Sequence, residues 1–111
     1  MANAAAVMLE ALGDPTRRQI FERLASRPRS VGEIHKGMPI SRPAVSQHLR
    51  VLKDAGLVID RGVGNRRYYQ PNPAALQALH AYFDRFWDRA LAAFQQAAEQ
   101  AAREEQKGKR K

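Results

Sequence analysis

Apolar side chains recur at helical spacing in the stretch 41–58. The inward stripe of this stretch consists of Val45, His48, Leu49 and Leu52. Ser41 offers an N-cap hydroxyl, Pro43 is tolerated in a first turn, and Gly56 supplies the left-handed residue that ends a helix. The opposite face carries Pro43, Gln47, Arg50 and Asp54, with Ser46 and Lys53 at one border. This polar face suits a helix that reads base edges in the major groove, although an ordinary amphipathic surface helix has the same periodicity.

The residues before this stretch predict three shorter helices. A first helix within residues 1–12 is apolar, and a second runs from Pro15 to about residue 26 behind the capping acid Asp14. Its cations Arg17, Arg18 and Arg23 are available to solvent or to phosphate. Ser30 and Glu33 form a capping-box pattern that opens a short third helix, and residues 36–39 make a turn. The third helix, the turn and the stretch from Ser41 therefore predict a helix-turn-helix.

After Gly56 the pattern changes from helix to strand. Residues 57–59 and 68–69 are rich in β-formers, and Gly62-Val63-Gly64-Asn65 between them tolerates positive φ. We predict a two-stranded hairpin that carries Arg61, Arg66 and Arg67, a basic wing placed to follow the DNA backbone. The predicted fold class is mainly α with a small β-hairpin: a winged helix-turn-helix of five helices and a two-stranded wing.

The last predicted helix runs from residue 73 to about residue 103 with one long apolar stripe. A body of this size has too little surface to cover so long a helix along its whole length, so the stripe predicts a subunit interface shared with the first helix. The expected interface residues are Val7, Met8, Leu12, Leu79, Phe83, Phe86, Trp87, Leu91 and Phe94. The stripe could instead fold back on the protein's own core. We expect residues 1–103 to form one DNA-binding and dimerisation domain, and residues 104–111 a disordered basic tail.

The charge distribution points to a polyanionic partner. The 111 residues carry a net charge of +8, and residues 35–70 hold seven cations against two acids, a net charge of +5. The absence of cysteine excludes disulfides and thiolate metal sites. No catalytic arrangement of Ser, His and acid has a recognisable spacing, so we expect a protein that is not an enzyme. Without a long apolar run or a secretory signal, we expect a soluble, cytoplasmic protein.

Three segments together resemble a known family. Asp14-Pro15-Thr16-Arg17-Arg18, the stretch SRPAVSQHLRVLKDAGLV at 41–58, and the glycine-containing wing are similar to winged-helix repressors of the ArsR/SmtB type. The resemblance covers roughly residues 7–95. It implies a homodimer that binds double-stranded DNA at an inverted-repeat operator, often near its own gene, and blocks transcription. By position, the DNA-facing residues are Ser41, Arg42, Ala44, Ser46, Gln47 and Arg50, with Arg61, Asn65, Arg66 and Arg67 in the wing.

The chain departs from the metal-sensing members of this family. The segment before the recognition helix reads SVGEIHK and contains no cysteine. His80, Asp84 and Asp88 have the spacing i, i+4, i+8 and could offer three ligands on one helix flank, but ion pairing with neighbouring arginines is the commoner role of such acids. We expect repression without a metal or another cofactor, and the sequence identifies no effector. Two alternatives stay open: an architectural DNA-binding protein of low specificity, and a protein-interaction module that uses the winged fold as a scaffold.

Overall fold

The computed structural model describes residues 3–109, which hold five helices and three short strands. The elements in chain order are α1 (Ala4–Ala11), α2 (Pro15–Arg23), β1 (Arg29–Ser30), α3 (Val31–His35), α4 (Arg42–Asp54), β2 (Val58–Val63), β3 (Arg66–Pro71) and α5 (Pro73–Lys109). The chain divides into two compact units, one up to Leu79 and one from His80 onward, and α5 contributes to both. Each unit is described separately below.

The helices of the first unit begin at side chains that cap them, as the sequence predicts. The Asp14 carboxylate accepts a hydrogen bond from the N–H of Arg17 at 2.9 Å, which holds the pKa of Asp14 below its ordinary value. At α3 the capping box is complete: the Ser30 hydroxyl accepts from the N–H of Glu33 at 3.3 Å, and the Glu33 carboxylate accepts from the N–H of Ser30 at 3.1 Å. Such caps satisfy N–H groups that have no partner inside the helix.

The C-terminus of α4 forms a Schellman motif. Gly56 has a φ of 81°, the N–H of Gly56 donates to the carbonyl of Lys53, and the N–H of Leu57 donates to the carbonyl of Leu52 at 2.9 Å. Leu52 and Leu57 are both fully buried, so the apolar contact of this motif belongs to the core. The chain reverses within these residues and enters the sheet at Val58.

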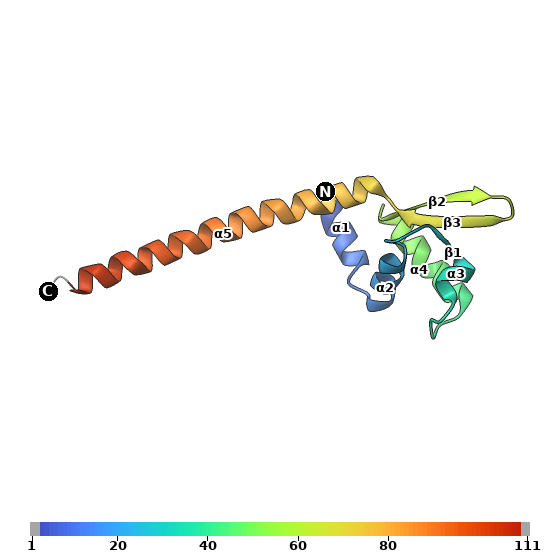
Figure 1. The fold of residues 1–111 in the computed structure, drawn as a ribbon, viewed down its shortest axis with the longest axis horizontal. Coiled ribbons are helices and arrows are strands. Elements are labelled where there is room, and N and C mark those ends of the chain that lie inside the picture. Colours follow the sequence, from blue (N-terminus) through green and yellow to red (C-terminus); the bar gives the residue numbers. More distant parts are fainter. Residues whose placement is uncertain (1–2, 110–111) are drawn as a thin grey trace. The chain divides into compact units, whose positions relative to one another are not determined.

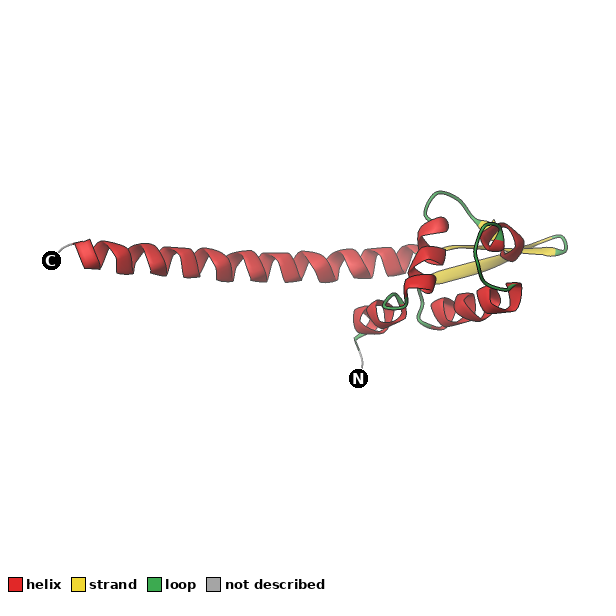
Figure 2. Ribbon diagram, turned by 90° about the horizontal axis from the view of Figure 1, so that it is seen from below, coloured by secondary structure: helices red, strands yellow, loops and turns green. Residues whose placement is uncertain are grey.

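The sheet has three antiparallel strands in the order β1-β3-β2. β2 and β3 form the predicted hairpin, with Val63 opposite Arg66 at its tip, and the tip extends past the helices of this unit (Figure 1 and Figure 2). The sequence did not predict β1, in which Arg29 pairs with Tyr69 and Ser30 with Tyr68. Two residues are too short for a periodicity signal, and the partner strand lies far along the chain, so only the tertiary fold shows this pairing.

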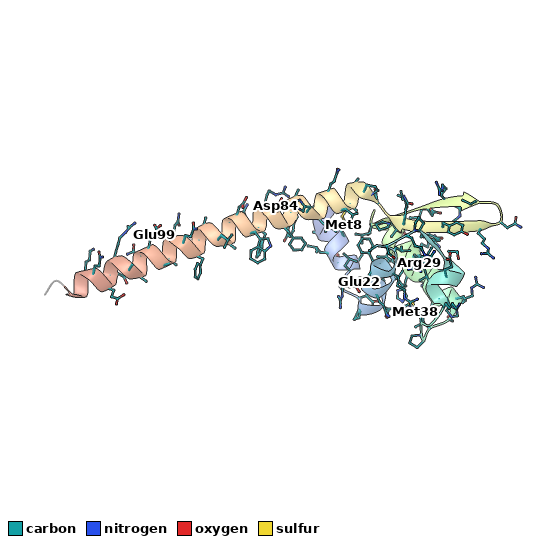
Figure 3. The ribbon with its side chains drawn as sticks, in the orientation of Figure 1. Met8, Glu22, Arg29, Met38, Asp84 and Glu99 are labelled. Carbon is teal, nitrogen blue, oxygen red and sulfur yellow. The ribbon has the colours of Figure 1, made fainter. Side chains whose placement is uncertain are left out.

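The core lies between the helices of the first unit and the base of the sheet. Its buried members are Met8, Ala11, Ile20, Leu24, Ile34, Met38, Val45, Leu49, Leu52, Leu57, Val58 and Ala75. Met8 and Met38, labelled in Figure 3, come from α1 and from the turn before α4. Met8 was an expected interface residue, but the structure places it in the core, while Leu12 and Leu79 are partly buried against that core. Full burial of each leucine or isoleucine stabilises the fold by roughly 1.5–3 kcal/mol.

Four arginines near α2 bind the C-terminal ends of helices. Arg18 is exposed to solvent, as expected, whereas Arg17 and Arg23 are half-buried. Arg17 Nε donates to the carbonyl of Ala11 at 2.7 Å, and an Arg18 guanidinium nitrogen donates to that of Leu12 at 2.9 Å. Arg23 donates to the carbonyls of Ile34 and Lys36, each at 2.8 Å. Arg29 Nε donates to the carbonyl of Arg23 at 2.7 Å. Cations at carbonyl ends complement the helix dipole, so these charges serve the fold.

The second unit consists of α5 from His80 onward, and its side chains surround the helix, Asp84 and Glu99 among them (Figure 3). The structure differs from the expected disordered tail over residues 104–109, which continue α5 to Lys109. Glutamate, glutamine and lysine are good helix formers, and Gln100 donates a hydrogen bond to Glu104 at 3.3 Å across one turn. Residues 110–111 of that tail lie outside the described residues. None of the helices in residues 3–109 combines the length and the apolarity that a membrane span requires.

Candidate nucleic-acid interface

The outer face of α4 carries polar side chains on a rigid support. Val45, Leu49 and Leu52 are buried where α4 packs on α2 and α3, so the rotation of the helix about its axis is fixed. That rotation exposes Ser46, Gln47 and Arg50, as expected for base readers, and leaves Ala44 half-buried. Deleting a buried leucine from such a core costs about 2–5 kcal/mol, so α4 is held firmly in position.

The two residues at the start of α4 have structural contacts of their own. The Ser41 hydroxyl accepts a hydrogen bond from the N–H of Ala44 at 3.2 Å and so caps the helix. Arg42 is exposed, but its guanidinium lies against α3: a Cβ added at Gly32 would stand 3.0 Å from a terminal nitrogen of Arg42. Both residues stay at the helix N-terminus, where an anion is favoured.

The wing presents its cations unequally. Arg61, Asn65 and Arg66 are exposed around the hairpin tip, where Gly64 has a φ of 62°. Arg67 is also exposed, but a guanidinium nitrogen of Arg67 lies 2.7 Å from a carboxylate oxygen of Asp60. Arg67 therefore holds the two strands together through an ion pair with Asp60.

Asp60 joins the wing to the recognition helix. Its side chain is only 8% exposed and pairs with Lys53 at 2.8 Å as well as with Arg67 at 2.7 Å. The hydrogen bond from Lys53, followed by that from Arg67, lowers the pKa of Asp60 below its ordinary value of 3.8. This carboxylate is therefore ionised at neutral pH and fixes the position of β2 and β3 beside α4.

A cleft of about 490 Å³ opens between α3, the start of α4 and the wing. Lys36, Arg42, Arg66 and Arg67 line it together with one acid, Glu33. Glu33 accepts from the N–H of Ser30 and pairs with Arg27 at 2.9 Å, and these contacts lower its pKa from 4.5 to about 2. The cleft therefore carries an excess of positive charge at its mouth.

A polar helix face on a rigid helix-turn-helix, with a basic hairpin anchored beside it, defines a winged helix-turn-helix DNA-binding protein. Within residues 3–109, Arg42, Arg50, Arg61 and Arg66 form no ion pair with an acid, and all four are exposed. These charges can meet phosphate or base edges without first breaking an internal contact.

Comparison with known proteins agrees with this class. Residues 12–61 match a family described as a helix-turn-helix domain. An HTH-type transcriptional regulator of Mycobacterium tuberculosis is 58% identical over 87 residues, which cover 78% of this chain and 81% of the relative. An ArsR-like transcriptional regulator from a Rhodococcus species has 34% identity and a TM-score of 0.71, over 86% of this chain and 92% of that one. The homodimeric winged helix-turn-helix DNA-binding domain of a Mycobacterium bovis protein has 31% identity and a TM-score of 0.63, over 79% and 82%. The chain belongs to the ArsR/SmtB family of helix-turn-helix transcriptional regulators.

The expected interface residues on α5 beyond Leu79 lie on one exposed face. Phe83, Phe86, Trp87, Leu91 and Phe94 are between 44% and 72% exposed, and Phe86 and Trp87 contact each other edge to face. Val7 on α1 is 38% exposed. Most monomeric proteins do not expose a contiguous group of large aromatic side chains to water.

The proposed ligand set on α5 reduces to one pair. His80 Nδ1 lies 3.2 Å from a carboxylate oxygen of Asp84, one turn along the helix. In residues 3–109, no three His, Asp or Glu side chains are grouped closely enough to share a metal ion.

Sequence reasoning did not identify two residues of this region as functional. Lys36 was assigned to a turn, but the structure places it in the basic cleft. Gly32 had no assigned role, but it provides the space that the Arg42 guanidinium occupies. A lysine in a turn and a glycine in a short helix have no distinctive pattern, so no sequence signal separates them from solvent-exposed residues.

Proposed function

We propose that this protein is a homodimeric repressor that binds an inverted-repeat DNA operator. The observation that carries the proposal is the outer face of α4, where exposed Ser46, Gln47 and Arg50 stand over a buried stripe that fixes their direction. Hydrogen-bonding side chains on a rigid helix can discriminate base edges, whereas a merely basic surface cannot.

The dimer is supported by the exposed aromatic face of α5 and by the homodimeric state of the Mycobacterium bovis relative. A two-fold axis would place the two recognition helices about 34 Å apart, one turn of the duplex, which calls for an inverted repeat. Blocking of transcription is supported by the repressor names of several relatives, among them a Bacillus subtilis repressor that is 37% identical over 70 residues. Autoregulation, and the absence of a metal requirement, belong to the same proposal.

The test is fluorescence anisotropy with two duplexes, the DNA upstream of the protein's own gene and a scrambled sequence, across a salt series. A preference of about 10³-fold or more for the native duplex, and a footprint of two symmetric half-sites, is the expected result. Equal binding to both duplexes that fades in parallel as salt rises would replace this proposal with an architectural role. A dimer that ignores both duplexes at low salt would favour the protein-interaction role.

A further inference from the structure

The cleft between α3, the start of α4 and the wing is basic, and ion pairs within residues 3–109 leave most of its positive charge uncompensated. Its volume of about 490 Å³ falls in the range of roughly 300–1,000 Å³ that is common for ligand sites. Three separate segments contribute cations to it: Lys36 after α3, Arg42 on α4, and Arg66 on β3.

Some charged side chains of the cleft form ion pairs within the protein, and others do not. Arg67 pairs with Asp60. The carboxylate of Glu33 pairs with Arg27 and accepts a hydrogen bond from the N–H of Ser30. Lys36, Arg42 and Arg66 form no ion pair among the residues that the structure describes. Three cations from three elements, facing one concavity with one neutralised acid, form a site for a polyoxyanion.

The guanidinium of Arg42 lies against α3, in the cleft. This group occupies the place above Gly32 where a side chain would otherwise stand, because a Cβ there would come within 3.0 Å of it. Gly32 and Arg42 both line the cleft, so the guanidinium is directed toward α3 and the wing. The base-reading residues Gln47 and Arg50, by contrast, do not line this cleft.

We infer that this cleft holds one phosphate of the DNA backbone, bound jointly by Arg42, Arg66 and Lys36, so that Arg42 is a positioning residue and reads no base. The inference rests on the proposed function and deepens it. A phosphate shared by the start of the recognition helix and by the wing fixes the register of both elements on the duplex, and Gln47 and Arg50 then meet defined base pairs.

The test is a double-mutant cycle with Arg42→Ala and Arg66→Ala on the native and the scrambled duplex. Each single change is expected to weaken both duplexes alike, by about tenfold, and to reduce the salt slope by about one. Because the two arginines bind the same phosphate, the double variant should lose clearly less than the product of the single losses. The control cycle pairs Arg42→Ala with Arg61→Ala, an exposed wing arginine outside the cleft, and should be multiplicative. A selective loss on the native duplex for Arg42→Ala, or multiplicative losses in the first cycle, overturns the inference.

Gly32→Ala tests the position of Arg42 without removing charge. Alanine favours the helix, so the melting temperature should stay constant or rise, while the affinity for both duplexes falls because the guanidinium is displaced. Unchanged affinity of this variant overturns the role of the Gly32 contact.

Free phosphate is the other source of this chemistry. Titration of the DNA-free protein with inorganic phosphate at constant ionic strength, followed by NMR of the arginine Nε–H groups, should show no saturation below about 1 mM, because one small anion lacks the neighbouring DNA contacts. Tight phosphate binding combined with full DNA affinity of Arg42→Ala would make the cleft a free-anion site and overturn the inference. The wild-type preference for the native duplex is measured separately. If the wild-type protein shows no such preference while Arg42 and Arg66 are coupled on both duplexes, the repressor proposal is wrong. The inference of a shared phosphate contact is then still supported.

Discussion

Lys53 at the end of the recognition helix and Asp60 on β2 lie 2.8 Å apart, Nζ to Oδ1. The other oxygen of the same carboxylate pairs with Arg67 on β3 at 2.7 Å. One nearly buried acid therefore joins α4 to both strands of the wing. The spacing between the polar outer face of α4 and the basic hairpin depends on this carboxylate.

Asp60→Asn should lower the free energy of unfolding by about 1 kcal/mol, because both cationic partners are more than half exposed and solvent screens their ion pairs. The same change releases two cations and should raise the affinity for scrambled DNA at low salt. Urea unfolding and anisotropy measure the two effects. Asp54→Asn, an exposed acid on α4 without an ion pair in the described residues, is the matched control. Asp54→Asn should raise the net charge by the same amount as Asp60→Asn but leave the free energy of unfolding unchanged. Equal losses of unfolding free energy in the two variants would contradict the role of Asp60.

Glu33, in the first turn of α3, makes the free energy of unfolding depend on pH. Its pKa falls from 4.5 to about 2 in the folded protein, mainly through the N–H of Ser30 and then through Arg27. A lowered pKa stabilises the fold above pH 4.5, and the contribution is lost as the pH falls toward 2. The difference in unfolding free energy between wild type and Glu33→Gln should therefore be largest near neutral pH and should shrink as the pH falls from 4.5 to about 2. Glu22→Gln, at an exposed position in α2, is the control. A difference that stays constant across this range would contradict the capping-box contribution.

Arg50→Ala tests base reading by the exposed face of α4. If Arg50 contacts a guanine, the cognate duplex should lose about 1–3 kcal/mol of binding free energy while the scrambled duplex changes little. Arg85→Ala, an exposed arginine on α5 without an ion pair among residues 3–109, removes the same charge from the second unit and should leave both duplexes nearly unaffected. Equal losses on the two duplexes would make Arg50 a phosphate contact.

Phe94→Glu tests the proposed dimer at the most exposed aromatic residue of α5, which is 72% exposed. A charge inside an apolar interface should raise the dimer dissociation constant by about 30-fold or more, corresponding to at least about 2 kcal/mol. Analytical ultracentrifugation across a concentration series measures this constant. Gln96→Glu, two residues away on a different side of the helix, should leave it unchanged. A wild-type protein that is monomeric at high concentration would remove the dimer from the proposal.

Zinc should leave DNA affinity unchanged, because His80 and Asp84 form only a two-residue pair and no third ligand is grouped with them in the described chain. Fluorescence anisotropy measures the DNA affinity with and without an equimolar amount of zinc, and again after treatment with a chelator. A change of about tenfold that His80→Ala abolishes would establish a metal-responsive site on α5.

The recognition helix was predictable because its signals are local. Ser41, the apolar stripe and Gly56 mark its start, its buried face and its end within one segment, and the structure has the helix at Arg42–Asp54 with these roles. The capping box of Ser30 and Glu33 and the β2–β3 hairpin were predictable for the same reason, since each depends on residues a few positions apart.

The roles of the charges were decided by the tertiary structure alone. Arg23 and Arg66 are both cations in polar segments. Arg23 binds carbonyls at the end of α3, eleven and thirteen residues away, whereas Arg66 is exposed on the wing and forms no ion pair within residues 3–109. Likewise, Met8 and Phe94 both belong to apolar helical stripes, but Met8 is buried in the core and Phe94 is exposed. Helices and turns follow from neighbouring residues through backbone geometry, so the sequence by itself determined them. A charge or an apolar side chain acquires its role from partners that only the folded chain brings near it.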